Sequence, residues 1–138
     1  MPLTARVLAQ GAGWRVMDVV CDAGPEDRPF EERHELVSVA VVTAGTFQYR
    51  STQGNAVLVP GGVLLGNPGC RFECAHDHGR GDRCLAFQYA PEVFERIVAD
   101  TPGTQRPCFG VPSLPPIADL AGFVASAQVL YGDRKSVV

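Results

Sequence analysis

The fold of this chain is decided by the stretch from Leu36 to Gly69, which reads LVSVAVVTAGTFQYRSTQGNAVLVPGGVLLGNPG. Short runs of β-branched and aromatic residues, which fit a pleated strand, alternate here with turns rich in glycine, asparagine and proline. We expect strands at residues 36–43, 47–51, 56–59 and 63–65. Short strands with turn signals about every ten residues are typical of an antiparallel sandwich or barrel rather than of alternating strands and helices.

The same pattern continues on both sides of this stretch. Before it, residues 6–21 predict one or two strands separated by a glycine-rich turn, and the polar residues 22–33 predict a loop. After it, we expect strands at residues 70–78 and 84–89, joined by a short hairpin turn. The sequence therefore predicts a mainly β domain built as a small antiparallel barrel.

Two helices are expected after the last strand. Pro91 and Glu92 can open a helix, whose apolar residues follow helical spacing up to about Asp100. The proline-rich segment 103–116 predicts an extended connector. Residues 117–131 contain no proline and predict a second helix. Its apolar stripe, which we expect to form a subunit interface, consists of Ala118, Ala121, Ala125 and Val129.

The size and composition indicate one soluble, cytoplasmic domain. The 138 residues, of which 46% are hydrophobic and 20% charged, suffice for one core. No segment approaches the roughly 20 apolar residues that span a bilayer, and the first residues do not resemble a secretory signal. We assign residues 1–100 to the barrel with its first helix, and residues 101–138 to the connector and C-terminal dimerisation helix of the same domain.

Charge and cysteine content exclude two further classes. The net charge of −3 provides no basic excess, whereas binding to nucleic-acid phosphates relies on clustered lysine and arginine. Five cysteines, an odd number without a signal peptide, argue against a disulfide framework. We therefore expect reduced thiols and no DNA binding by this part of the protein.

Five short motifs follow one another in a specific order. They are ERHE at 32–35, GTFQYR at 45–50, LVPG at 58–61, LLGNPG at 64–69 and GDRCLAF at 81–87. With the Pro-Glu helix start after them, they resemble the N-terminal cupin-type half of arabinose-regulator (AraC-type) transcription factors. The resemblance covers roughly Arg28 to Arg96.

The resemblance implies a function as well as a fold. In that family a jelly-roll β-barrel receives a small effector, helices pair two subunits, and a separate C-terminal domain binds promoter DNA. We therefore expect the N-terminal effector-sensing and dimerisation domain of such a regulator, a homodimer that reaches DNA only through a domain absent from this chain and that contacts no membrane. Neither predicted helix has the polar and basic side chains of a recognition helix.

A cupin-fold metalloenzyme is the alternative from another class. Metal-dependent cupins typically offer a His-x-His pair and a glutamate on one strand, and a further histidine after a Pro-x-Gly turn. Here His34 stands alone, and Leu65 occupies the later position. We therefore expect no catalysis, and we interpret His34 as a hydrogen-bonded residue at the surface or at a strand end. An interaction module without a ligand is a third interpretation.

The strand predicted at residues 70–78 carries the most chemically specific side chains. Alternation places Cys74, His76 and His78 on one face, where they could bind one zinc ion together with Cys84. Cys84 joins this face if it pairs with His78, and points away if His78 pairs with Arg83. A closed set of two cysteines and two histidines would suit a structural or sensing zinc ion.

The same residues fit two other interpretations. Free cysteines often pack as small hydrophobic residues, and exposed thiolates can act as redox or soft-metal sensors. The effector itself could therefore be a small molecule or a metal ion. We expect Cys21 and Cys108 to be ordinary core or surface thiols.

Overall fold

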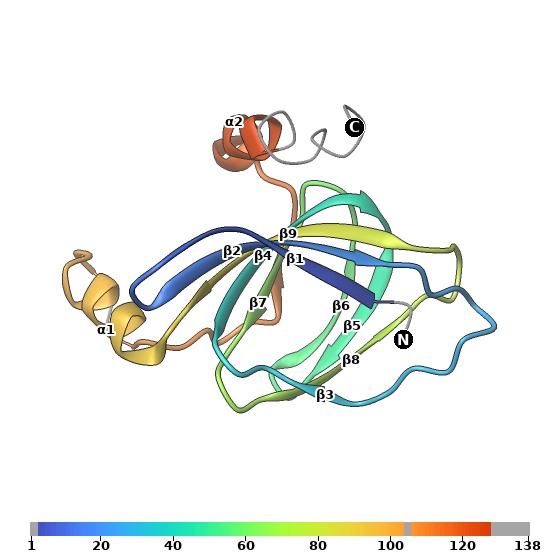
Figure 1. Cartoon of the computed structure of the whole chain (residues 1–138), viewed down its shortest axis with the longest axis horizontal. Helices are drawn as coiled ribbons and strands as arrows, with labels where there is room; N and C mark the ends of the chain where they lie inside the picture. Colours follow the sequence, from blue (N-terminus) through green and yellow to red (C-terminus); the bar gives the residue numbers. More distant parts are fainter. Residues whose placement is uncertain (1–2, 104–105, 128–138) are drawn as a thin grey trace.

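The computed structural model describes residues 3–103 and 106–127, whose strands form two antiparallel sheets (Figure 1). Six strands pair in the order β1-β2-β9-β4-β7-β10, and four pair in the order β3-β8-β5-β6. The larger sheet contains β1 (Leu3–Gly11), β2 (Trp14–Cys21), β4 (Val37–Gly45), β7 (Val63–Gly66), β9 (Asp82–Tyr89) and β10 (Ser113–Leu114). The smaller sheet contains β3 (Glu32–Arg33), β5 (Phe47–Ser51), β6 (Gly54–Leu58) and β8 (Arg71–Ala75).

The main core lies between the two sheets. Side chains from β4 and β9 on one sheet meet side chains from β5 and β6 on the other, and partly buried residues from β2 and β8 complete the layer. The fully enclosed members include Val42, Phe47, Tyr49 and Leu58, each at most 3% exposed. Burial of such side chains is the main favourable term in folding, about 1.5–3 kcal/mol for each large apolar side chain.

The chain changes sheet between β4 and β5 at a position that only glycine fits. Gly45 has φ +83°, and a Cβ atom there would lie 2.3 Å from the carbonyl oxygen of Gly81. A side chain would therefore meet both backbone strain and a direct clash. The sharp turn at Gly45 lets β4 end in the larger sheet and β5 begin in the smaller one.

The connector after the first helix covers the outer face of the larger sheet. Phe109 packs against Val41, Val63 and Leu65, so β4 and β7 are apolar on both faces. The side chain of Asn67 holds this segment, accepting from the Phe109 N–H at 2.7 Å and donating to its carbonyl at 2.9 Å. The segment predicted as a plain connector thus contains β10, which pairs with β7.

The predicted hairpin between residues 70–78 and 84–89 is wrong. Strand β8 ends at Ala75 and pairs with β3 and β5, whereas β9 pairs with β2 and β4 in the other sheet. The segment between them therefore crosses from one sheet to the other instead of forming a tight turn within one sheet. Neither of the two pairing registers considered for His78 occurs.

Both predicted helices are present. Helix α1 (Pro91–Ala99) begins with a proline in its first turn, and α2 (Ala118–Ala127) lies within the predicted range 117–131. Ala118, Ala121 and Ala125 of the apolar stripe are exposed, whereas Val129 lies outside the described residues. Within the residues described, no helix has both the length and the apolar character needed to cross a bilayer.

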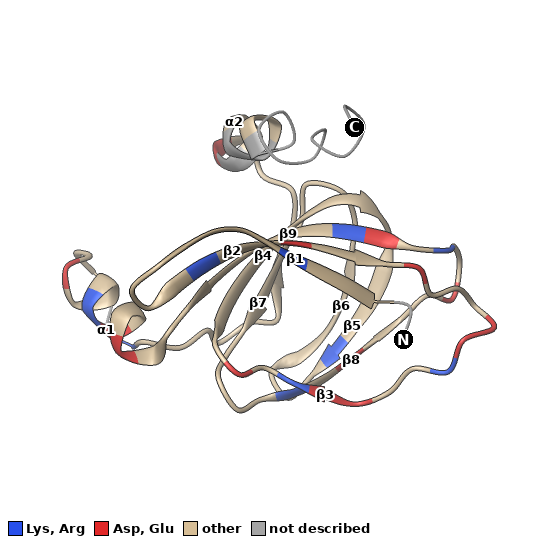
Figure 2. Cartoon of the chain, in the orientation of Figure 1, with Lys and Arg blue, Asp and Glu red and all other residues tan. Residues whose placement is uncertain are grey.

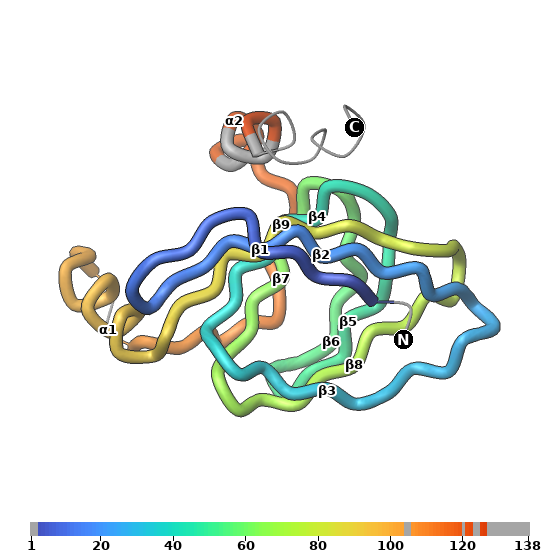
Figure 3. Tube along the Cα trace, in the orientation of Figure 1, coloured from blue at the N-terminus to red at the C-terminus, as the bar shows by residue number. Residues whose placement is uncertain are grey.

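Acidic and basic residues are interspersed along the loops and strands (Figure 2). Basic segments occur on several strands, on the loop before β3 and on α1 in this view, with acidic segments beside many of them. The loop from β2 to β3 runs past the crossing from β8 to β9 at one end of the domain, as the tube in Figure 3 shows. The backbone N–H of Gly81 donates to the carbonyl of Ala23 at 2.8 Å and joins the two segments.

Candidate functional site: a cavity between the sheets

A cavity of about 540 Å³ lies between the two sheets. Its size falls within the roughly 300–1,000 Å³ range of small-molecule sites. The space exists because Ala40 on β4 and Ala86 on β9 are direct cross-strand partners, and two small side chains face each other at the centre of the larger sheet. The apolar part of the wall is formed by Met17, Val19, Ala40, Phe47, Leu64, Phe72 and Ala86.

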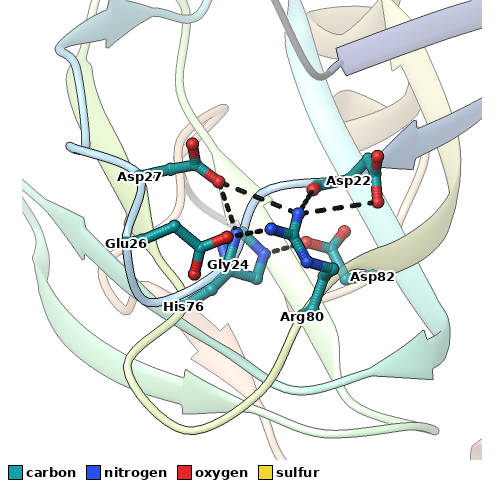
Figure 4. Close-up of polar contacts among 7 residues, drawn as sticks. All are labelled: Asp22, Gly24, Glu26, Asp27, His76, Arg80 and Asp82. Carbon is teal, nitrogen blue, oxygen red and sulfur yellow. Dashed lines mark hydrogen bonds and ion pairs between the residues drawn. The ribbon is translucent and has the colours of Figure 1, made fainter.

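The loop between β2 and β3 forms one rim of the cavity and is fastened to Arg80. The Arg80 guanidinium donates to the carbonyl of Asp22 at 2.7 Å, pairs with the carboxylate of Glu26 and lies 4.0 Å from that of Asp27 (Figure 4). The Gly24 N–H donates to the Asp27 carboxylate at 2.8 Å. Because Arg80 is exposed, these contacts position the loop but contribute little to global stability.

His34 directly follows β3 and is hydrogen-bonded, as expected of a residue at a strand end, but it is buried in the cavity wall and does not lie at the surface. Its Nε2 lies 2.8 Å from the hydroxyl oxygen of Tyr49, and its ring stacks on Phe72 with centroids 4.0 Å apart. A Cβ atom on Gly66 would lie 2.5 Å from the ring, so this glycine makes room for it. Burial lowers the pKa of His34 to about 4, and the ring is neutral at neutral pH.

Polar groups also lie on the wall formed by β2, β4 and β9. The Nε of Arg15 donates to the Gln88 side-chain oxygen at 2.6 Å, and both residues line the cavity with Ser38. The two residues are cross-strand partners on β2 and β9. The cavity thus has an apolar body with hydrogen-bonding and cationic groups on its wall, which is the usual composition of a small-molecule site.

A second polar cluster lies on the wall where the two sheets meet. His76 follows β8, and its Nε2 lies 2.6 Å from Oδ2 of Asp82, the first residue of β9 (Figure 4). Cys21, the last residue of β2, is the cross-strand partner of Asp82. Desolvation by burial raises the pKa of both the Cys21 thiol and the Asp82 carboxyl.

The four residues predicted to bind a metal occupy different environments. Cys74, His76 and Cys84 line the cavity, whereas His78 is exposed beyond the end of β8. Burial raises the pKa of the Cys74 and Cys84 thiols, so neither is a ready thiolate. The four ligand atoms do not form one close group in the part of the chain that the structure describes. A zinc site with this ligand set stays a prediction.

The close group that the structure does contain combines one predicted residue with two others. Potential ligand atoms of Cys21, His76 and Asp82 all lie within 4.8 Å of one another. The sequence predicts Cys21 to be an ordinary core or surface thiol and gives Asp82 no distinct role. The only signal for their proximity is the pairing of β2 with β9, two strands far apart in the sequence.

Comparisons with known proteins agree on the fold. A family model described as the AraC-like ligand binding domain matches residues 20–128. No curated protein matches the chain significantly. The cupin domain of an XRE family transcriptional regulator from Enterobacter cloacae superposes with a TM-score of 0.55 at 12% identity, covering 66% of this chain and 99% of that one.

Two other solved structures have similar scores. A cupin superfamily protein from Desulfitobacterium hafniense gives a TM-score of 0.52 at 18% identity, covering 64% of this chain and 77% of that one. A DMSP lyase from Ruegeria pomeroyi gives a TM-score of 0.54 at 14% identity, covering 64% of this chain and 47% of that one. The predicted mainly β, cupin-like fold with C-terminal helices is therefore confirmed, although hydrogen bonding leaves two separate sheets instead of one closed barrel.

Proposed function

We propose that this chain, which belongs to the AraC-like ligand binding domain family, is the effector-sensing domain of an AraC-type transcription regulator. The observation that carries the proposal is the cavity of about 540 Å³ between the sheets. Its apolar body, with hydrogen-bonding and charged groups on the wall and rim, suits a small effector that combines an apolar part with polar groups. The regulator would act in the cytoplasm and would reach DNA through a separate domain.

A regulatory role is favoured over catalysis. The family match is to a ligand-binding domain, and the fold alone does not determine function, since similar cupin folds occur in a transcriptional regulator and in a lyase. Two residues stand where metal-dependent cupins have metal ligands. His34 is hydrogen-bonded to Tyr49 and stacked on Phe72. Leu65 has no ligand atom on its side chain. We therefore propose that binding alone is the function of the cavity.

A cavity-filling variant tests where the effector binds. Ala40→Leu adds volume to the cavity wall, whereas Ala44→Leu adds the same volume at an exposed position on the same strand. We would screen sugars, aromatic acids and short fatty acids for a rise in melting temperature. A compound at 100 times its Kd stabilises the native state by about 2.7 kcal/mol.

The two variants should respond differently to such a compound. It should raise the melting temperature of the natural chain and of Ala44→Leu, and should lose most of its effect on Ala40→Leu. Equal binding to both variants would place the ligand outside the cavity and contradict the proposal.

We further propose a homodimer formed through α2. The support is the exposed apolar stripe of Ala118, Ala121 and Ala125, because a helix face of this kind is normally covered by another element. Sedimentation velocity at micromolar concentration should give the mass of a dimer. Ala121→Glu should shift the protein to a monomer while Ala44→Glu should not. A strict monomer of the natural chain would exclude this interface.

A further inference from the structure

Three potential metal ligands from three strand ends meet on one wall of the cavity. Cys21 ends β2, Asp82 begins β9 as its direct partner, and His76 follows β8 in the opposite sheet. All three residues line the cavity, and their ligand atoms lie within 4.8 Å of one another. Because both sheets fix the positions of these residues, the cluster is a rigid feature of the fold.

The carboxylate of Asp82 is buried beside His76 and the Cys84 thiol, neither of which is permanently charged. The side chains of His76 and Asp82 are 2% and 8% exposed, and Asp82 has no arginine or lysine within ion-pair distance in the described residues. By contrast, the carboxylate of the buried Asp18 on β2 forms an ion pair with Arg83, whose Nε lies 2.8 Å from Oδ1. A buried carboxylate normally needs a cation or a metal nearby. At Asp82 this requirement is not met by an arginine or a lysine of the described chain.

We infer that Cys21 Sγ, His76 Nε2 and the Asp82 carboxylate bind a divalent transition-metal ion of the zinc class. A thiolate, an imidazole and a carboxylate are the three side-chain ligands that zinc takes in proteins, and this mixed set does not suit magnesium or calcium, which prefer oxygen alone. The ion replaces the thiol proton and any proton held between Nε2 and Oδ2, and these protons go to the solvent.

Metal binding requires only small movements of the three ligands. The Cys21 sulfur, which lies within 4.8 Å of the other two ligand atoms, has to come to about 3.6 Å from each of them, a change of at most about 1.2 Å. Bonds of about 2.0–2.1 Å to nitrogen and oxygen place two tetrahedral ligands about 3.4 Å apart. The 2.6 Å contact between Nε2 and Oδ2 therefore has to open by less than about 1 Å. The Cys84 thiol, 3.8 Å from the other Asp82 oxygen, supports the carboxylate from outside the ligand set.

The site differs from the one predicted from sequence in an important respect. It shares His76 with that set, but it offers three protein ligands instead of four. A fourth position is then open on the cavity side, where a water molecule or a donor atom of a bound molecule completes the coordination. The site does not depend on the proposed effector function, because metal binding can be measured without any effector.

Cobalt substitution tests the ligand set directly. Co²⁺ added to the metal-free protein should bind at one equivalent per chain, with a thiolate-to-cobalt charge-transfer band in the near ultraviolet, and Zn²⁺ should displace it. Cys21→Ser should remove the band and weaken binding at least about 100-fold, since even outer-shell partners are worth 10–100-fold. Cys108→Ser, at an exposed cysteine, should change neither.

Further variants separate ligation from folding. His76→Gln should weaken Co²⁺ binding as Cys21→Ser does, while His78→Gln, at the exposed histidine two residues later, should bind normally. Cys21→Asp keeps a ligand atom but not sulfur, so it should bind Co²⁺ without the charge-transfer band. Circular dichroism of each variant checks that the sheets are intact.

Two results would overturn the inference. One is the absence of stoichiometric Co²⁺ binding by the natural chain. The other is a charge-transfer band that survives Cys21→Ser and disappears in Cys74→Ser. This result would show that the metal binds to Cys74, one of the cysteines predicted from sequence, and not to Cys21. Neither result bears on the Ala40→Leu test, so failure of the metal site and failure of the proposed effector function can be told apart.

Discussion

His34 Nε2 lies 2.8 Å from the hydroxyl oxygen of Tyr49, and the same hydroxyl donates to the carbonyl of Leu65 at 3.2 Å. Because that carbonyl can only accept, the hydroxyl oxygen is left to accept from Nε2–H of a neutral ring. The contact joins the segment before β4 to β5 and β7. It explains why the cavity wall includes a buried histidine that has no carboxylate partner among residues 3–103 and 106–127.

The protonation of His34 should reduce stability in mildly acidic solution. The unfolded histidine takes up a proton near pH 6.5, whereas the folded one does so only near pH 4. Between these values the unfolded state binds more protons, so the free energy of unfolding falls as the pH drops from about 6.5 to about 4, by up to about 3 kcal/mol. Urea denaturation across this range measures the effect.

A matched pair of variants separates the effect of this histidine from that of the carboxyl groups that titrate in the same pH range. His34→Gln should flatten the pH dependence between pH 6.5 and 4, and His78→Gln should leave it unchanged. NMR titration of the imidazole provides a direct reading. An observed His34 pKa near 6.5 would show that the ring is not held neutral by burial.

Removing the Tyr49 hydroxyl should destabilise the fold. Tyr49→Phe leaves both the His34 ring nitrogen and the Leu65 carbonyl without their partner, and each buried unsatisfied group costs about 1–3 kcal/mol. Tyr89→Phe is the control, because its hydroxyl makes no hydrogen bond to the described residues. A loss below about 0.5 kcal/mol in Tyr49→Phe would mean that water replaces the hydroxyl.

Gly45 and Gly69 separate backbone strain from steric clash. They have nearly the same φ, +83° and +82°, but a Cβ atom would lie 2.3 Å from a carbonyl oxygen at Gly45 and would meet nothing within 4 Å at Gly69. Gly69→Ala should cost about 1 kcal/mol for the left-handed backbone alone. Gly45→Ala should cost several times more, and equal losses in urea denaturation would contradict the clash.

Arg80→Ala should loosen the rim of the cavity without unfolding the domain. The contacts of Arg80 with Glu26 and Asp27 are exposed, so the free energy of unfolding should change by less than about 1 kcal/mol. Amide hydrogen exchange at Gly24 and Asp27, which bond to each other across the loop, should become faster. Unchanged exchange there would show that the loop holds its conformation without Arg80.

The strands were predictable from the sequence because alternation and turn residues are local signals. The pairing of each strand with its neighbours was not predictable from these local signals. The segment after His78 reads as a hairpin turn, yet Gly81 lies at a crossing between sheets, and only the assembled core decides which sheet receives β9. The proximity of Cys21 and Asp82 is not predictable from the sequence for the same reason, since it depends on the pairing of β2 with β9.

Strand β10 and the residue before it connect the cavity to the segment that leads to the C-terminal helix. Leu64 lines the cavity and pairs with Ser113, and the Leu65 N–H donates to the Pro112 carbonyl at 2.9 Å. Helix α2 begins at Ala118, a few residues further on. A bound molecule that displaced β7 would therefore also displace β10, and the short strand would couple the occupancy of the cavity to the position of the helix.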